Sequence, residues 1–111
     1  MSELQPALDD MERLREIGKR IRREYGAERV LLYGSMARGE AGPDSDVDIF
    51  VIAETQEKFF DRIATVLGLV RDLRELMPLS PIVLTPGEVA ERLRIGDQFA
   101  AEILQTGKDL V

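Results

Sequence analysis

The sequence contains neither cysteine nor histidine in its 111 residues. Without cysteine, disulfide bonds, thiolate catalysis and cysteine-based zinc sites are excluded. Without histidine, no imidazole can act as a general base or metal ligand. The chain also lacks an apolar run of membrane-spanning length and any visible signal peptide, so we expect a soluble, cytoplasmic protein. Any catalytic site here must work without thiolates or imidazoles.

The sequence also has fewer basic residues than acidic ones. The chain has 15 Lys and Arg against 21 Asp and Glu, for a net charge of -6. This balance argues against tight, sequence-independent binding to duplex nucleic acid. Hydrophobic residues make up 44% of the chain, which predicts a packed fold rather than disorder. The length suits one core, so we expect residues 1–111 to form a single domain.

The spacing of apolar residues and of Gly and Pro predicts alternating helices and strands. The expected order is helix, strand, short turn, strand, long helix, strand and two closing helices. Glu54-Thr55 is the expected cap of the long helix, and Gly26 and Gly107 are expected to end the first and last helices. The expected ranges are helix 8–25, strands 29–33 and 47–52, helix 55–77, strand 81–85, helix 86–95 and a last helix from 96–97 to 106.

The lengths of the connections predict how the strands pair. A long helix between the second and third strands is a βαβ crossover, so these two strands should run parallel. Only about a dozen residues join the first strand to the second, which favours an antiparallel pair. The fold class is therefore α/β (α+β): a small mixed sheet of three core strands with flanking helices.

Three surface features have more than one interpretation. The first helix carries many arginines, which we expect to form a solvated face paired with the helix's own acids rather than a surface for a nucleic acid or an acidic partner. Tyr33 precedes Gly34 and could stack on a base, although packing against the first helix is the expected role. Phe59 and Phe60 could extend the apolar stripe of the long helix beyond the sheet, which would indicate a partner or dimer surface.

Asp46 and Asp48 lie two residues apart at the start of the second strand. Their side chains should point to the same face, while Val47 and Ile49 point into the core. Neighbouring carboxylates repel each other and need a cation or a proton between them at neutral pH. Magnesium with oxygen ligands and substrate phosphates fits that arrangement.

Gly34-Ser35 follows the first strand directly. Glycine permits a sharp turn and a close approach of the backbone to a ligand. Ser35, at the expected start of a helix, offers a hydroxyl and neighbouring amides to triphosphate oxygens. Arg38, one turn later, could add a charge-assisted contact to phosphate.

Each of these pieces has an ordinary structural interpretation when taken alone. A Gly-Ser pair after a strand is usually a turn with a helix cap, and Asp-x-Asp is often a solvated junction. Ser35 is not expected to be a hydrolase nucleophile, since the chain has no histidine and no Gly-x-Ser-x-Gly elbow. The order of the pieces favours function: a strand, Gly34-Ser35, ten residues, then Asp46-x-Asp48 opening a second strand.

This order resembles the signature of the polymerase-β-type nucleotidyltransferase superfamily, and within it the minimal nucleotidyltransferase branch. Ala37-Arg38-Gly39 and Ser45-Asp46 are also typical of that branch. The specific part of the resemblance lies within residues 33–52, although chain length and element order agree throughout.

The resemblance implies a site in which Gly34 and Ser35 hold a nucleoside triphosphate, ATP above all, while Asp46 and Asp48 bind Mg²⁺. The implied reaction transfers a nucleoside monophosphate to an acceptor hydroxyl and releases pyrophosphate. The branch also implies a partner with a HEPN domain, which the nucleotidyltransferase adenylylates as the antitoxin of a toxin–antitoxin pair. A homo- or hetero-oligomer is compatible with this.

One departure from the family pattern concerns the third strand. Active members commonly carry a third carboxylate there, as metal ligand and general base, but residues 79–85 contain no acid. Glu88 follows at the expected opposite end of the strand, and Glu40 and Asp44 could approach from the loop. Three hypotheses therefore stand: an active nucleotidyltransferase, a nucleotide-binding but weakly active antitoxin, and an interaction domain that keeps the turn and acids only for folding.

Overall fold

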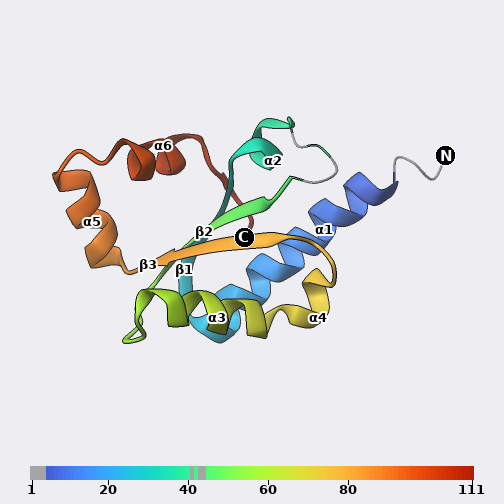
Figure 1. Ribbon diagram of the computed structural model, residues 1–111, viewed down its shortest axis with the longest axis horizontal. Helices are drawn as coiled ribbons and strands as arrows, with labels where there is room; N and C mark the ends of the chain where they lie inside the picture. The colour runs from blue at the N-terminus through green and yellow to red at the C-terminus, as the bar shows by residue number, and fades with distance from the viewer. Residues whose placement is uncertain (1–4, 41, 43–44) are drawn as a thin grey trace.

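The computed structural model describes residues 5–40, 42 and 45–111. Helices alternate with strands along the chain (Figure 1). The elements are α1 (Gln5–Arg20), the π-helical turn η2 (Ile21–Tyr25), β1 (Ala27–Tyr33), α2 (Ser35–Arg38), β2 (Val47–Ala53), α3 (Phe59–Leu69), α4 (Arg71–Arg74), β3 (Leu79–Leu84), α5 (Pro86–Arg94), α6 (Gln98–Thr106) and β4 (Lys108–Asp109).

The strands form one mixed sheet in the order β3-β2-β1-β4. The antiparallel pairing of β1 with β2 and the parallel pairing of β2 with β3 confirm the expected topology. The sheet has one strand more than expected, because β4 pairs with Leu31 and Leu32 of β1. With only two residues, β4 is too short to leave an alternating pattern in the sequence.

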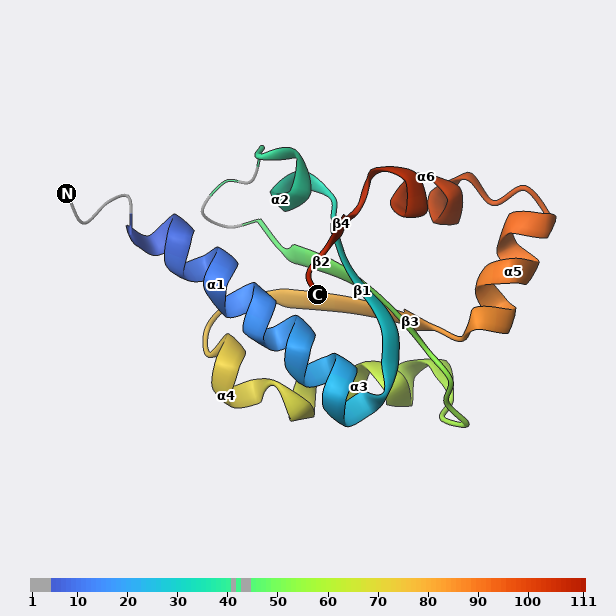
Figure 2. The ribbon, with the colours of Figure 1, turned by 180° about the vertical axis from the view of Figure 1, so that it is seen from behind.

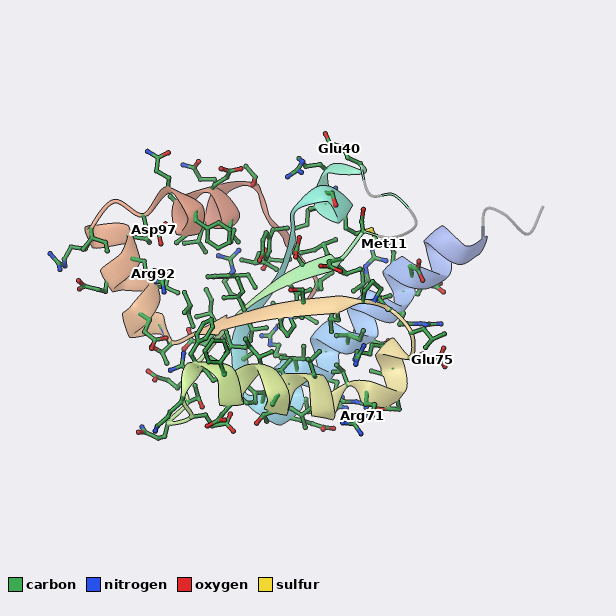
Figure 3. All side chains as sticks on the ribbon, in the orientation of Figure 1. Met11, Glu40, Arg71, Glu75, Arg92 and Asp97 are labelled. Carbon is green, nitrogen blue, oxygen red and sulfur yellow. The ribbon has the colours of Figure 1, made fainter. Side chains whose placement is uncertain are left out.

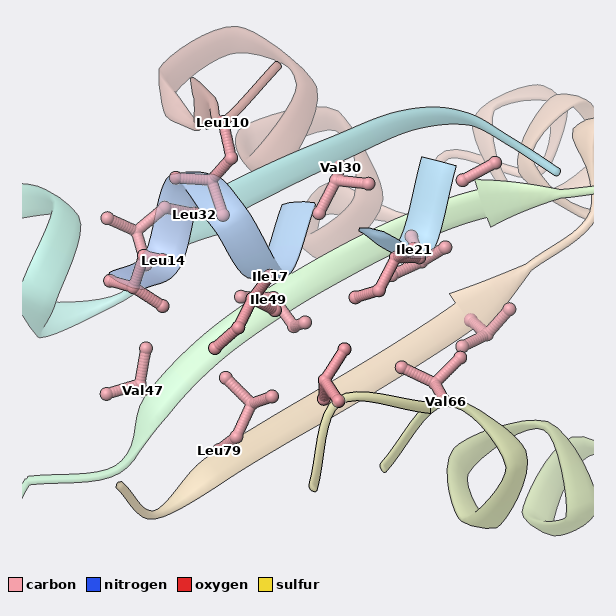
Figure 4. Packing of buried hydrophobic residues seen from close by; sticks show 14 of the residues in the cluster. Leu14, Ile17, Ile21, Val30, Leu32, Val47, Ile49, Val66, Leu79 and Leu110 are labelled. Atoms are coloured by element: carbon pink, nitrogen blue, oxygen red, sulfur yellow. The ribbon is translucent and has the colours of Figure 1, made fainter. Parts of the chain in front are cut away.

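Helices cover the two faces of the sheet unequally (Figures 1 and 2). On one face, α1, η2, α3 and α4 bury a large apolar cluster in which Leu14, Ile17 and Ile49 have no exposed surface (Figure 4). On the other face, α5 and α6 cover a smaller cluster around Phe50. Val47 and Ile49 belong to the first cluster, as predicted. The start of β2 on the second face is left more open.

The predicted long helix from 55 to 77 is wrong in its bounds. The α3 helix begins only at Phe59, after Lys58 at the cap position, and a break at Val70 separates it from α4. Thr55 does not cap the helix, because its hydroxyl accepts a hydrogen bond from the Glu57 amide and another from Tyr25. Those contacts fix a turn before the helix, so its start is delayed.

Several helix ends agree with the sequence analysis. Gly26 ends η2 with a left-handed φ of 75°, and Gly107 follows α6. Pro86 is the first residue of α5, and Asp97 caps α6 by accepting from the Phe99 amide. These signals are local, so sequence identifies them well.

Two arginines of α1 pair with acids, but these acids lie on α4 and at its end rather than on the first helix itself. Arg20 contacts Asp72 at 2.6 Å, and Arg13 contacts Glu75 at 3.3 Å. The two pairs tie α1 to the α4 region, where Glu75 marks the end of α4 (Figure 3). In the described part of the chain, no helix has the length and apolar character needed to cross a membrane.

Candidate active site

Asp46 and Asp48 lie together at the start of β2. Asp48 is the second residue of the strand and pairs with Tyr33 on β1 and Ser80 on β3. Asp46 directly precedes the strand and is exposed, whereas Asp48 is partly buried. Since side chains alternate along a strand, both carboxylates belong to the face that α5 and α6 cover.

The electrostatic state of this pair favours a cation. Burial, and then the negative charge of Asp46, raises the pKa of Asp48 above its ordinary value. Within residues 5–40, 42 and 45–111, no arginine or lysine forms an ion pair with either carboxylate. A hard divalent cation between the two would relieve both the desolvation and the repulsion.

Gly34 brings the phosphate-binding turn against the carboxylates. Its φ of 78° and ψ of −157° are accessible to glycine and strained for any other residue. A Cβ on Gly34 would lie 2.5 Å from Oδ2 of Asp48, well inside van der Waals contact. Glycine is therefore needed here twice, once for the backbone angle and once for the contact with Asp48.

Ser35 begins α2, as predicted, and this short helix ends at Gly39 with a left-handed φ of 73°. The amides of Gly39 and Glu40 close the helix by donating to the carbonyl oxygens of Met36 and Ser35. Among the described residues, no hydrogen bond involves the side chain of Ser35.

Arg38 is exposed at the end of α2, and its Nε donates to Oε1 of Glu40 at 2.9 Å (Figure 3). Both side chains are more than half exposed, so the pair is weak and a phosphate could replace Glu40. Glu40 therefore pairs with Arg38 in this structure rather than supplying a third carboxylate beside Asp48. Asp44, the other loop candidate, lies outside the described residues.

A cavity of about 430 Å³ opens between α2 and α6. Its volume falls in the range of small-molecule sites, roughly 300–1,000 Å³. Gly34 lines this cavity, and a Cβ added to Gly34 would meet the Asp48 carboxylate, so the cavity lies next to the carboxylate pair. The remaining lining residues include Tyr33, Ala37, Arg38, Phe99, Glu102 and Thr106.

Tyr33 does not pack against α1, and that prediction is wrong. Its ring meets Phe50 and Phe99 edge to face, with ring centroids 6.5 and 5.8 Å apart, on the opposite side of the sheet. Leu32 faces the α1 cluster instead, because neighbouring side chains of a strand alternate. Burial and the charge of Asp48 raise the pKa of Tyr33 to about 12, so its hydroxyl stays neutral at pH 7.

Sequence reasoning missed the contribution of α6 to this cavity. Phe99 is an apolar residue of α6, yet half of its surface is exposed. Phe99, Glu102 and Thr106 recur at helical spacing, which places them on one face of α6. This spacing was visible in the sequence, but nothing in it shows that the face meets α2.

The described residues contain no cluster of three acidic side chains able to hold a metal ion. On β3, Ser80 lies beside Asp48, and no residue of the strand is acidic. Glu88 lies at the far end of β3, where it caps α5 and contacts Arg62 at 2.7 Å. The expectation that Glu88 is remote from the carboxylate pair is thus confirmed.

Comparison with known proteins identifies the family and the fold. The family model described as "Nucleotidyltransferase domain" matches residues 14–106, which include both motifs. A similar solved structure is that of a proposed nucleotidyltransferase from Sulfolobus solfataricus, with a TM-score of 0.61 and 26% sequence identity. The alignment covers 82% of this chain and 80% of that one. Among curated proteins, no sequence matches the chain.

Proposed function

The chain belongs to the nucleotidyltransferase domain family, and on that premise we propose that it transfers AMP from ATP to a hydroxyl of a protein or RNA acceptor. Residues 1–111 form one such domain in this proposal. The observation that carries it is the proximity of Gly34 to Asp48, since a Cβ added to Gly34 would lie 2.5 Å from Oδ2 of Asp48 and the turn is thus beside the carboxylate pair.

Magnesium fits the donor set at the start of β2. Asp46 and Asp48 would hold the ion, and the triphosphate would complete its oxygen ligands. The bound ion supplies charge neutralisation on the phosphates and on the leaving pyrophosphate. The raised pKa of Asp48 supports this role, because a bound cation removes the penalty on its ionised form.

The other residues of the turn would hold the triphosphate. Ser35 offers its hydroxyl and the first amides of α2, and Arg38 would exchange Glu40 for a phosphate oxygen. The acceptor oxygen then forms a bond to the α-phosphorus, and the bond from that phosphorus to the bridging oxygen breaks to release pyrophosphate. The proton of the acceptor hydroxyl passes to water, since β3 offers no carboxylate to receive it.

The proposed acceptor is a HEPN-domain protein, with this chain as the antitoxin of the pair and the reaction in the cytoplasm, where ATP is available. The test incubates the purified chain with α-labelled ATP, Mg²⁺ and a purified HEPN-domain protein. We expect label on the partner with the wild type and none with Asp46→Asn/Asp48→Asn. Asp61→Asn, an exposed carboxylate on α3, is the matched control and should label normally. Equal labelling by the double variant would contradict the proposal.

A second candidate function follows from the missing acid on β3. A general base contributes about 10²–10⁴-fold to a rate, so its absence slows transfer without preventing nucleotide binding. In this alternative the chain binds nucleotide but protects cells by covering its partner. Equal protection by the wild type and by Asp46→Asn/Asp48→Asn would favour it. If neither nucleotide nor metal binds in calorimetry, only an interaction domain remains.

A further inference from the structure

Phe99 lies on α6 with half of its surface exposed, although the neighbouring Ala100 and Ile103 are buried against the sheet. The edge-to-face contact with Tyr33 at 5.8 Å fixes the orientation of the ring at the wall of the cavity between α2 and α6. Aromatic side chains that stay exposed beside a cavity offer a flat surface for planar ligands. The core does not require an aromatic ring at this position.

The polar groups of the cavity have a definite pattern. Arg38 is the cation among the described lining residues, and it lies on α2 beside Gly34. On the α6 side, Glu102 presents a carboxylate, which only accepts hydrogen bonds. The Thr106 hydroxyl donates to the backbone oxygen of Glu102 at 2.8 Å, so its own oxygen is left as an acceptor. A ligand whose anionic end binds at α2 must therefore offer hydrogen-bond donors to the acceptor oxygens on α6.

We propose that this cavity holds the base and ribose of the nucleotide, with the base against Phe99, and that Glu102 selects bases carrying an exocyclic amino group. The inference rests on the proposed function, because it places the triphosphate at Gly34 and the carboxylate pair. The position of Gly34 supports it, since Gly34 lines the cavity and lies close enough to Asp48 that an added Cβ would be 2.5 Å from Oδ2 of its carboxylate.

The selectivity has a simple chemical reason. The amino group of adenine or cytosine donates to a carboxylate, whereas the oxo group at the same position of hypoxanthine or uracil repels it. ATP with ITP, and CTP with UTP, are pairs of matched size that differ at this group. A glutamine at position 102 can donate as well as accept, so Glu102→Gln should abolish the distinction within each pair.

The experiment is calorimetric titration of the intact chain, with Mg²⁺, by ATP, ITP and inorganic tripolyphosphate. The wild type should bind ATP roughly tenfold more tightly than ITP, as expected for one hydrogen bond to a charged group. Phe99→Ala should weaken ATP and ITP by about tenfold, the size of a lost base–aromatic contact, and leave tripolyphosphate unchanged. Glu102→Gln should bind ATP and ITP equally.

Two control variants match these changes at the other end of the sheet. Phe60→Ala removes an aromatic ring that is 79% exposed on α3, and Asp61→Asn removes an exposed carboxylate. Both should bind like the wild type. Phe99→Leu, with its fold checked by circular dichroism, separates loss of the ring from loss of packing and should bind like Phe99→Ala.

The results of these titrations test this inference separately from the proposed function. If ATP binds in a manner that requires Asp46 and Asp48 but is unaffected by Phe99→Ala and Glu102→Gln, the base lies elsewhere, and this inference alone is overturned. If neither ATP nor tripolyphosphate binds the wild type, the proposed function fails, and the inference with it.

Discussion

Charged side chains are arranged differently at the two ends of β2 and β3. At their start, Asp46 and Asp48 face each other's negative charge, and no described cation pairs with them. At their end, Arg62 is only 7% exposed, yet it donates to both oxygens of Glu88 and to the backbone oxygens of Glu57 and Val83. The charges at the far end are paired within the protein, whereas Asp46 and Asp48 have no cationic partner among the described residues.

The difference indicates that the two sets of charges contribute differently to the stability of the fold. Glu88 also completes a capping box with Thr85 at the start of α5, so the Arg62 contacts join α3, β3 and α5. Removing such a partner leaves buried polar groups without hydrogen bonds, which destabilises the fold. Removing a carboxylate from the pair on β2 relieves repulsion instead. Substitutions at the two ends should therefore change the free energy of unfolding in opposite directions.

The largest effect is expected for Arg62→Met, which keeps the length of the side chain and removes its charge. Loss of a buried, hydrogen-bonded partner should lower the free energy of unfolding by about 4 kcal/mol. Urea denaturation followed by circular dichroism measures this. Arg71→Met, an exposed arginine on α4, is the control and should cost little. A loss below about 1 kcal/mol for Arg62→Met would mean that Arg62 does not hold the fold.

The next largest loss of stability is expected at the Gly34 turn, beside the start of β2. Gly34→Ala should cost about 2 kcal/mol, because the backbone angle is strained and the Cβ meets the Asp48 carboxylate. Gly39→Ala is the matched control, since Gly39 has a similar φ of 73° but nothing within 4 Å of an added Cβ. The control should cost about 1 kcal/mol.

Adding Asp48→Ala to Gly34→Ala identifies the part of the loss that comes from the contact. The double variant should recover the steric part and leave only the backbone strain, so the two substitutions should not be additive. Additive losses in urea denaturation would show that Gly34 is required for its angle alone.

The pH dependence of stability should also separate the two ends. The Arg62 guanidinium holds the pKa of Glu88 below its ordinary 4.5, so this contribution to stability is present above pH 4.5 and is lost as the pH falls through the native pKa. Asp48 behaves in the opposite way. Its raised native pKa makes its ionised form a cost at neutral pH, which is relieved as the pH falls towards 3.8.

Glu88→Gln should therefore destabilise the protein at pH 7 and have little effect near pH 3, whereas Asp48→Asn should stabilise it slightly at pH 7 and have little effect near pH 3. Because Glu88 is partly exposed and thus screened, each change should be about 1 kcal/mol or less. Denaturation curves at several pH values give the measurement. Stabilisation by both variants, or by neither, would contradict the proposed contrast.

The sequence predicts the position of the turn and of the carboxylate pair at the start of β2 well, because each of these signals is local. Gly34 predicts the turn after the first strand. Its distance in sequence from Asp48 predicts where the second strand begins. The ion pair at the far end of β3 was not predicted. It joins Arg62 to Glu88, which lie 26 positions apart and meet only because α3 packs on β3. Sequence placed Glu88 remote from the site but could not identify its partner.

The faces of β1 were equally hard to assign. Val30, Leu31 and Leu32 are all buried, so no alternation reveals which side meets α1. That ambiguity led to the wrong partner for Tyr33 and concealed the cavity that it lines. The bounds of the long helix failed for a related reason, because the hydroxyl of Thr55 bonds to Tyr25, which no local pattern records.

The smallest effect on stability, and the sharpest test of the ligand-binding end, is expected for Glu40→Gln. The Arg38–Glu40 pair is exposed, so losing it should leave the denaturation curve unchanged within error. The same change frees Arg38 from its competitor, and tripolyphosphate with Mg²⁺ should then bind about threefold more tightly. Arg38→Gln should weaken that binding, again without loss of stability. A protein whose stability falls with either variant would use this pair as it uses Arg62 and Glu88, and the contrast between the two ends would not hold.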